Sequence, residues 1–365
     1  MERAGGSFYL CQLIQFDLAL NYLLPFLLVT LLTSPAFCQP TQRSLGDYTV
    51  FTIPFRGDSI TFAVVAKKGE LNKRKPIFLF RQGSLPIPLF TINPKTNRPA
   101  LTELPATCYD HEAEYYSIMI AKPGIPLVVN DSYLDTLFST RSAPKTGMYP
   151  AAYQSRNYLD YYVDQTNTVL RFVLSQPWAD PKRVVVAGGS EGYHVAIKTA
   201  YTNPQVTHLI GFSGNLDGRF QSILRTERMK GYTGEYTQDE AQRRVEALQN
   251  EWAALCRDSL NTSAVEGDPN RTMYSFSHGH NQDFLLALTI PICILYGTAD
   301  VGATSNDGLP LEFARRGKTN LTLRAYPNHD HTFHKLTYDS GGKVIDKFHN
   351  GAAVEKDYFE WLSQH

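Results

Sequence analysis

The sequence predicts an α/β fold in which a mainly parallel central sheet is flanked by helices. Short apolar runs alternate with longer amphipathic segments along most of the chain, as expected when strands and their covering helices follow one another. The run 184–187 (Val-Val-Val-Ala) is continuously apolar, which is typical of a strand buried on both faces of a parallel sheet. A glycine-rich turn then joins this run directly to a helical segment.

The individual elements follow from the local pattern. The turn residues at 56–58 (Arg-Gly-Asp) separate two strand-like segments, 48–54 and 59–67, which should form a hairpin. Apolar spacing indicates helices over 158–176 and 193–202, the second stopped by Asn-Pro, and a closing amphipathic helix over 350–363. The remaining short apolar runs are expected strands at 76–81, 116–121, 184–187, 208–212, 291–296 and 321–326.

Residues 215–288 interrupt this alternation. Within them, a helical segment over 237–258 has an apolar stripe, and a polar loop is expected over 260–273; the stripe consists of Val245, Leu248, Trp252 and Leu255. We therefore expect a helical cap inserted between two strands of the sheet. The alternative is an extended crossover helix with no role over the site.

The first 38 residues have the pattern of a signal peptide. An apolar run over 18–33 is followed by Ala36 and Cys38, small residues at the −3 and −1 positions of a cleavage site before Gln39. We therefore expect export to the periplasm or the extracellular space, and a mature domain over 39–365 without a stable membrane span. The alternative is an uncleaved N-terminal membrane anchor.

Composition excludes some kinds of partner. The chain has 35 basic and 35 acidic residues, so its net charge gives no electrostatic basis for binding nucleic acid or an anionic membrane. No Cys/His spacing resembles a zinc site, and we expect neither a metal nor a cofactor. Cys293 lies in an apolar run and should be buried, whereas Cys108 and Cys256 could pair in an oxidising compartment.

The segment Gly188-Gly189-Ser190-Glu191-Gly192 contains the candidate nucleophile. A serine hydroxyl is a poor nucleophile unless a base contacts it, an acid orients that base, and donors stabilise the oxyanion. A tight strand-to-helix turn presents such a serine, and glycines two residues before and after it relieve the crowding. We therefore assign Ser190 as the nucleophile. The alternative is a glycine-rich turn whose serine only caps a helix.

Over most of its mature part, the chain resembles the α/β-hydrolase superfamily, and most closely the branch of dienelactone hydrolases and prolyl-oligopeptidase catalytic domains. Two segments support this resemblance, WADPKRVVVAGGSEG at 178–192 and IPICILYGTAD at 290–300. In the superfamily, the second of these is a strand whose following loop contains the acid. The resemblance therefore implies Asp300 as the acid, with Asp307 as the alternative further along the loop.

The resemblance also implies that the base follows the acid in the chain, just before a small residue and an aromatic one. His331, followed by Thr332 and Phe333, fits that pattern best. His329 is the second candidate, and His334 is expected in a helix or turn beyond.

Two backbone N–H groups should form the oxyanion hole. One belongs to Glu191, directly after the nucleophile, and we expect its carboxylate to turn away into a polar contact. The second should come from the loop after the strand at 76–81. Many members of the superfamily have His-Gly there, whereas this chain has Gln82-Gly83-Ser84, so Ser84 or Gly83 is the candidate donor.

These residues predict a serine hydrolase that cleaves an ester through an acyl-enzyme. The alternatives are a serine peptidase of the prolyl-oligopeptidase type and a non-catalytic binding protein on a hydrolase fold. The expected substrate is a small-molecule ester or a short peptide. Aromatic residues could line an acyl pocket or serve as ordinary packing, namely Tyr133, Phe138, Tyr149 and Tyr153.

Overall fold

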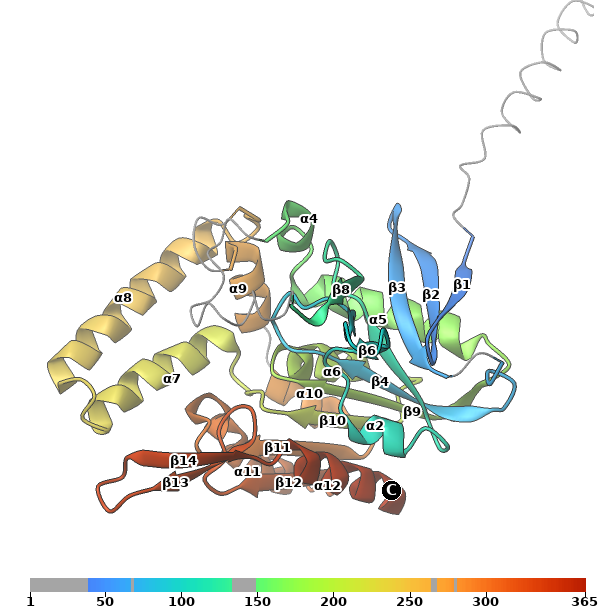
Figure 1. Ribbon diagram of the computed structural model, residues 1–365. Helices are drawn as coiled ribbons and strands as arrows, with labels where there is room; N and C mark the ends of the chain where they lie inside the picture. Colours follow the sequence, from blue (N-terminus) through green and yellow to red (C-terminus); the bar gives the residue numbers. More distant parts are fainter. Residues whose placement is uncertain (1–38, 67–68, 133–148, 264–267, 279–280) are drawn as a thin grey trace, which may run out of the picture. The chain divides into compact units, whose positions relative to one another are not determined.

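The computed structural model describes residues 39–66, 69–132, 149–263, 268–278 and 281–365 (Figure 1). The signal peptide predicted at 1–38 lies outside the described residues, as do Tyr133 and Phe138. Thr41–His365 forms one unit of structure, which contains the central sheet and its covering helices.

The described residues form a nine-stranded central sheet. From β7 (Tyr116–Ile120) to the edge strand β12 (Leu321–Tyr326), neighbouring strands are parallel, whereas β1 (Thr41–Leu45), β2 (Tyr48–Phe55) and β3 (Asp58–Val65) run antiparallel to their neighbours. The predicted mainly parallel sheet and the predicted hairpin are both confirmed. In spatial order the strands are β1 (Thr41–Leu45), β2 (Tyr48–Phe55), β3 (Asp58–Val65), β7 (Tyr116–Ile120), β4 (Lys75–Arg81), β9 (Ala179–Gly189), β10 (His208–Phe212), β11 (Ile292–Gly297) and β12 (Leu321–Tyr326).

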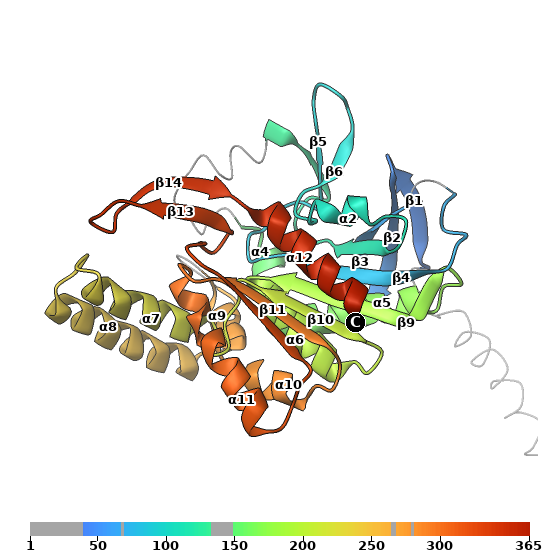
Figure 2. The same ribbon diagram turned by 90° about the horizontal axis from the view of Figure 1, so that it is seen from below.

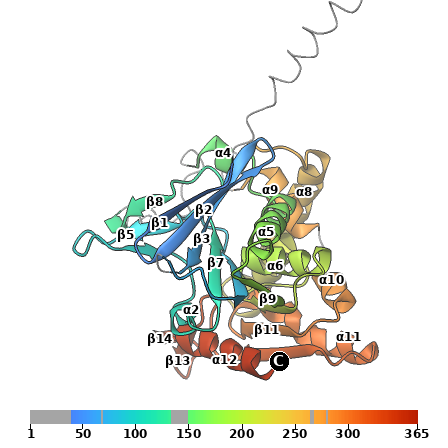
Figure 3. The ribbon, with the colours of Figure 1, turned by 90° about the vertical axis from the view of Figure 1, so that its right-hand side faces the viewer.

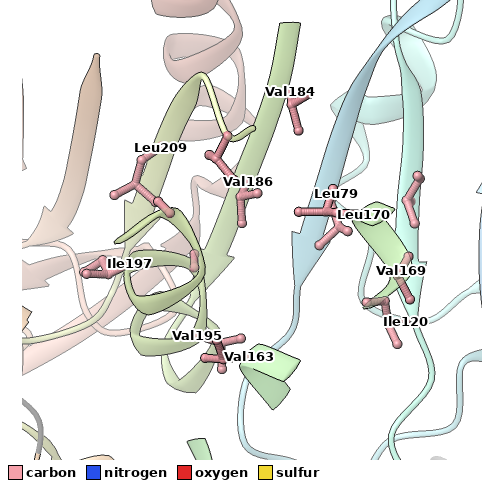
Figure 4. Packing of buried hydrophobic residues seen from close by; sticks show 14 of the residues in the cluster. Leu79, Ile120, Val163, Val169, Leu170, Val184, Val186, Val195, Ile197 and Leu209 are labelled. Carbon is pink, nitrogen blue, oxygen red and sulfur yellow. The ribbon is translucent and has the colours of Figure 1, made fainter. Parts of the chain in front are cut away.

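The central strands are buried on both faces of the sheet, and their successive side chains point alternately into two core clusters. Val184 and Val186 of β9 belong to one core cluster, while Val185 and Ala187 belong to the other. Figure 4 shows the first cluster, where Val186 and Leu209 of the sheet lie near helical side chains. This two-sided burial explains why the strands are continuously apolar in sequence.

Helices cover the two faces. On one face lie α5 (Leu159–Leu174), α6 (Glu191–Thr202), α10 (Asn281–Ala287) and α11 (Leu309–Arg315), whose apolar residues join the first cluster. The other face is covered by α12 (Gly351–Gln364) and the short α2 (Thr107–Asp110). Figure 2 shows α12 crossing in front of the strands, and Figure 3 shows α5 and α6 on the opposite side of the sheet.

Between β10 and β11, the described residues contain four helices, α7 (Arg219–Tyr232), α8 (Gln238–Arg257), α9 (Asn270–Ser277) and α10. The Thr237 hydroxyl accepts a hydrogen bond from the Glu240 N–H and so caps α8. Trp252, from the predicted stripe, packs on Phe220 of α7 and Tyr274 of α9, with ring centroids 4.9 and 5.9 Å away. The loop predicted over 260–273 is wrong at its end, because α9 begins at Asn270.

Several small elements were not predicted. A hairpin of β13 (His334–Tyr338) and β14 (Val344–His349) follows β12, so His334 begins a strand rather than a helix or turn. A second small sheet contains β5 (Phe90–Ile92), β6 (Pro99–Leu101) and β8 (Val128–Asn130). The connections also contain α4 (Ala151–Gln154) and the 3₁₀ helix η2 (Val301–Gly308). These segments are short or polar, so they have no periodic apolar signal.

The disulfide considered from the sequence is not formed. Cys108 is buried under α12, whereas Cys256 is exposed near the end of α8, and both are free thiols. Cys293 is buried in β11, as predicted.

Candidate active site

Ser190 lies at a tight turn between β9 and α6, with backbone angles of φ 55° and ψ −117°. Such positive φ is strained for a residue with a side chain, and it persists only where the surroundings enforce it. A Cβ on Gly188 would lie 2.0 Å from the Gly192 carbonyl oxygen, and one on Gly192 would lie 2.0 Å from the Arg81 carbonyl oxygen. The two outer glycines are therefore required by backbone contacts, and the turn is packed against the end of β4.

Ser190, His331 and Asp300 form a chain of hydrogen bonds. His331 Nδ1 lies 2.6 Å from Asp300 Oδ2, and His331 Nε2 lies 3.0 Å from Ser190 Oγ. Because a carboxylate only accepts hydrogen bonds, Nδ1 donates to Asp300, and in the neutral ring Nε2 is left to accept from the serine hydroxyl. The hydrogen bond to Asp300 raises the pKa of His331 above its ordinary value.

The three side chains come from the carboxyl ends of three parallel strands. Ser190 follows β9, Asp300 follows β11, and His331 lies in the turn after β12. Open α/β sheets form their sites at this edge. The turn that contains His331 is held against the segment after β11, because the Ala299 N–H donates to the His329 carbonyl oxygen at 2.9 Å. Within the turn, Asp330 Oδ1 accepts hydrogen bonds from the backbone N–H groups of Thr332 and His334.

The alternative acid and bases lie in other contacts. Asp307 accepts a hydrogen bond from the Tyr296 hydroxyl. His329 is buried, with Nδ1 2.8 Å from the Pro327 carbonyl oxygen and Nε2 3.0 Å from Asn350 Nδ2, so both ring nitrogens have structural partners. His334 Nδ1 lies 2.7 Å from the Thr332 hydroxyl. Of the predicted candidates, the structure therefore brings Asp300 and His331 to Ser190.

The loop after β4 lies directly beside the serine. A Cβ on Gly83 would be 3.6 Å from Ser190 Cβ. The Gly83 carbonyl oxygen accepts from Lys122 Nζ at 2.5 Å, and the Ser84 carbonyl oxygen accepts from the Tyr153 hydroxyl at 2.9 Å. In a trans peptide the C=O and N–H point in opposite directions, so the Ser84 N–H points away from Lys122.

The other predicted oxyanion donor is the Glu191 N–H. Glu191 is the first residue of α6, where a backbone N–H has no acceptor within its own helix. Its carboxylate is buried and lies 3.2 Å from Lys122 Nζ, which is the polar contact expected from the sequence. Lys122 therefore holds both the Gly83 carbonyl and the charge next to the nucleophile.

Sequence reasoning missed the buried polar cluster formed by Lys122, Arg81, Tyr153 and Tyr162. Arg81 ends β4, contacts Gln165 Oε1 at 3.2 Å, and lies over the Tyr162 ring at 5.1 Å. Burial lowers the pKa of Arg81 to about 10, so its guanidinium stays charged at neutral pH. The sequence signal that could have revealed this cluster is a cationic residue at the end of an apolar strand or just after it, because such a charge is rarely buried without partners. Tyr153 supports Ser84 and is not among the side chains that line the two cavities at the nucleophile.

These two cavities meet at Ser190, and both include Ser84, Ser190, Ser213 and His331 in their walls. The first, of about 390 Å³, has mostly apolar walls and lies over the sheet end and the start of α12; its apolar lining includes Phe80, Leu85, Phe212, Phe333, Val354 and Tyr358. The second, of about 230 Å³, is more polar and is partly formed by α7 and α9 through Arg219, Ser222, Ile223 and Phe276.

The first cavity also contains an unusual carboxyl group. Burial raises the pKa of Glu103 to about 7, although the nearby Lys122 opposes this effect. Glu103 therefore combines a pKa near neutrality with a place in the same cavity wall as Ser190.

The described residues contain no group of His, Cys, Asp and Glu side chains that could hold a metal ion. Among their helices, none has the length and apolar character needed to cross a membrane.

No protein-family model and no curated protein matches the chain. Solved structures do match it. An acylaminoacyl peptidase from Pyrococcus horikoshii aligns with a TM-score of 0.51 at 10% identity, over 93% of this chain and 42% of its own. The chain has the α/β-hydrolase fold.

Two further solved structures that match the chain differ in length from each other. The α/β hydrolase GrgF from Penicillium aligns with a TM-score of 0.45 at 12% identity, over 90% of this chain and 98% of its own. A puromycin-hydrolysing peptidase from Mycobacterium tuberculosis aligns with a TM-score of 0.44 at 14% identity, over 80% of this chain but only 36% of its own. The chain thus spans less than half the length of both peptidases.

Proposed function

We propose that this protein is a serine hydrolase that cleaves a carboxylic ester through an acyl-enzyme. The main support is the hydrogen-bonded series Ser190–His331–Asp300 at a strained strand-to-helix turn. This arrangement gives the serine a base within hydrogen-bond distance and gives the base a carboxylate that fixes its tautomer.

In the first step, Ser190 Oγ attacks the ester carbonyl carbon while His331 Nε2 takes the hydroxyl proton. Asp300 stabilises the resulting imidazolium, whose Nδ1–H it already accepts. The carbonyl oxygen becomes an oxyanion, for which we assign the N–H groups of Glu191 and Ser84 as donors, with Gly83 as the alternative. The Lys122 contacts with Gly83 and Glu191 hold both donor segments in place.

When the tetrahedral intermediate collapses, the bond to the leaving oxygen breaks and His331 gives its proton to that oxygen. The alcohol departs and leaves an acyl-Ser190 ester. Water then attacks this ester while His331 takes a proton from the water. In the second collapse the bond between the acyl carbon and Ser190 Oγ breaks, His331 returns the proton to Oγ, and the carboxylic acid is released. The steps require only groups of the chain and water.

We assign an ester as the scissile bond because an ester is more reactive than a peptide bond. Its cleavage needs no binding elements beyond the nucleophile, the base and the oxyanion donors. The apolar first cavity supports a substrate with an apolar group next to the carbonyl. A peptidase remains the alternative, and p-nitroanilides of dipeptides and of prolyl peptides distinguish the two.

The decisive experiment combines labelling with turnover. The purified protein should react with a fluorophosphonate probe and hydrolyse p-nitrophenyl esters, and Ser190→Ala should lose both, with kcat/KM lower by roughly 10⁴-fold or more. Full activity in Ser190→Ala would contradict the proposal. An unlabelled, well-folded wild type would favour a binding protein instead, and faster cleavage of the anilides than of the esters would favour a peptidase.

We further propose that residues 1–38 direct export and are cleaved before Gln39. The small residues Ala36 and Cys38 and the apolar run over 18–33 support this. Mass spectrometry of the protein from the exported fraction should give an N-terminus at Gln39. An intact N-terminus in a membrane fraction would favour the uncleaved anchor.

A further inference from the structure

The wall of the second cavity contains an arginine that the proposed reaction does not use. Arg219 is the first residue of α7, and its side chain lines this cavity together with Ser190 and His331. A group held by Arg219 would therefore belong to the same molecule whose carbonyl is attacked by the serine.

In the Arg219 guanidinium, Nη2 has an ion-pair partner, whereas Nη1 has no hydrogen-bond partner among the described residues. Its Nη2 lies 2.6 Å from Asp268 Oδ2, which sets the orientation of the planar group. Its Nη1 is shielded from solvent and has no hydrogen-bond partner among the described residues. A shielded N–H of a charged group without an acceptor is rare, because it loses hydration without replacement. The Arg219 side chain as a whole is 34% exposed and lines the cavity, so a ligand acceptor reaches Nη1 once the side chains that cover this atom are displaced.

The other titratable groups on the cavity wall do not compete for Arg219. Glu191 Oε1 pairs with the buried Lys122, whereas its buried Oε2 has no hydrogen-bond partner among the described residues and forms no ion pair with Arg219. Burial, with a contribution from Arg219, lowers the pKa of His194 to about 4, so this ring is neutral at neutral pH. His194 Nδ1 lies 2.6 Å from Asn281 Nδ2 and accepts from it, which leaves the ring N–H on Nε2. His331 is the proposed base and already contacts Ser190 and Asp300.

We propose that Arg219 binds a carboxylate of the substrate, so that the enzyme prefers esters with an apolar group in the first cavity and a carboxylate in the second. A planar guanidinium matches the geometry of a carboxylate and forms charge-assisted hydrogen bonds with it. The proposal rests on the proposed function, and it narrows the substrate class from esters in general to esters of amphiphilic acids or alcohols.

Matched ester pairs test the proposal. On the acyl side, 4-nitrophenyl hydrogen succinate is compared with 4-nitrophenyl butyrate; on the alcohol side, 4-acetoxybenzoate is compared with 4-acetoxybenzamide. In each pair only one member has a carboxylate, and enzyme-free rates are subtracted. The wild type should prefer the carboxylate in one of the pairs. Arg219→Gln should reduce that preference in kcat/KM by about tenfold or more and leave the neutral ester unchanged, since a hydrogen bond to a charged group is lost.

Two further variants separate contact from charge and from folding. Arg228→Gln removes a cation from the same helix, where Arg228 contacts Gln242 outside the cavity, and it should keep the full preference. Arg219→Lys retains the charge without the planar group and should keep part of the preference. Labelling of each variant by the fluorophosphonate probe at the wild-type rate would verify an intact nucleophile.

The outcomes distinguish this inference from the proposed function. A wild type that hydrolyses the neutral esters without preferring a carboxylate in either pair would overturn the inference and leave the proposed function standing. Equal loss on both members of a pair in Arg219→Gln would also overturn it. A wild type that cleaves none of the esters and resists the probe would overturn the proposed function itself.

Discussion

The two halves of the candidate site are fixed in different ways. The nucleophile half, which includes Ser190 and the loop after β4, is held by backbone contacts and by the buried Lys122–Glu191 pair. The base half depends on side-chain hydrogen bonds in loops, and the His331 side chain is 50% exposed. Changes to the contacts that hold the nucleophile in place should therefore mainly lower stability, whereas changes to the hydrogen bonds of the base should mainly lower activity and shift its pH dependence.

The largest effect is expected in the base half. Asp300→Asn removes the charge that stabilises the His331 imidazolium, and kcat should fall by roughly 10³- to 10⁴-fold with little change in the midpoint of urea unfolding. The carboxylate raises the pKa of His331, and the reaction needs the unprotonated ring. Without the carboxylate, the rising limb of the pH–rate profile should therefore move to lower pH. An unmoved limb would contradict the assignment of Asp300 as the partner of the base.

The next largest effect is expected in the nucleophile half. Lys122→Met leaves the Glu191 carboxylate buried without its cation, and the free energy of unfolding should fall by about 3–5 kcal/mol. The double variant Lys122→Met/Glu191→Gln should recover part of this loss. As a matched control, Lys198→Met breaks an ion pair with the exposed Asp160 and should cost less than about 1 kcal/mol. If urea unfolding gave equal losses of unfolding free energy for Lys122→Met and Lys198→Met, the buried pair would not be what holds the nucleophile half.

A smaller effect, on the pH dependence of activity, is expected from Glu103, which lines the first cavity. Burial raises the pKa of Glu103 to about 7, so this carboxyl becomes negative as the pH rises through neutrality. A negative charge opposes oxyanion formation, so activity should fall above pH 7 while the rising limb reports His331. Glu103→Gln should remove the falling limb and raise kcat/KM at high pH by about three- to tenfold. Glu360→Gln, at an exposed position of α12, should leave the profile unchanged.

The central sheet could be predicted well from the sequence because its inner strands are continuous runs of apolar residues and are buried on both faces. The same criterion failed for β13 and β14, whose residues are mostly exposed, and for the start of α9. The predicted nucleophile turn depends on five adjacent residues, and the structure has the expected strand, turn and helix there. Lys122 was missed because its contacts with Gly83 and Glu191 join residues that are distant in the chain.

The strand–turn–helix that presents Ser190 follows from local sequence, because backbone preferences and glycine contacts act over a few residues. The local pattern also limits the candidate base to a short segment with three histidines. That His331 contacts Ser190, 141 residues earlier, and that His329 is held by Pro327 and Asn350 depends on the tertiary structure. The same is true of Arg219, whose place in one cavity wall with Ser190 depends on how α7 packs against η2 and α9. Such contacts are set by the folding of distant segments onto one another, which no local pattern encodes.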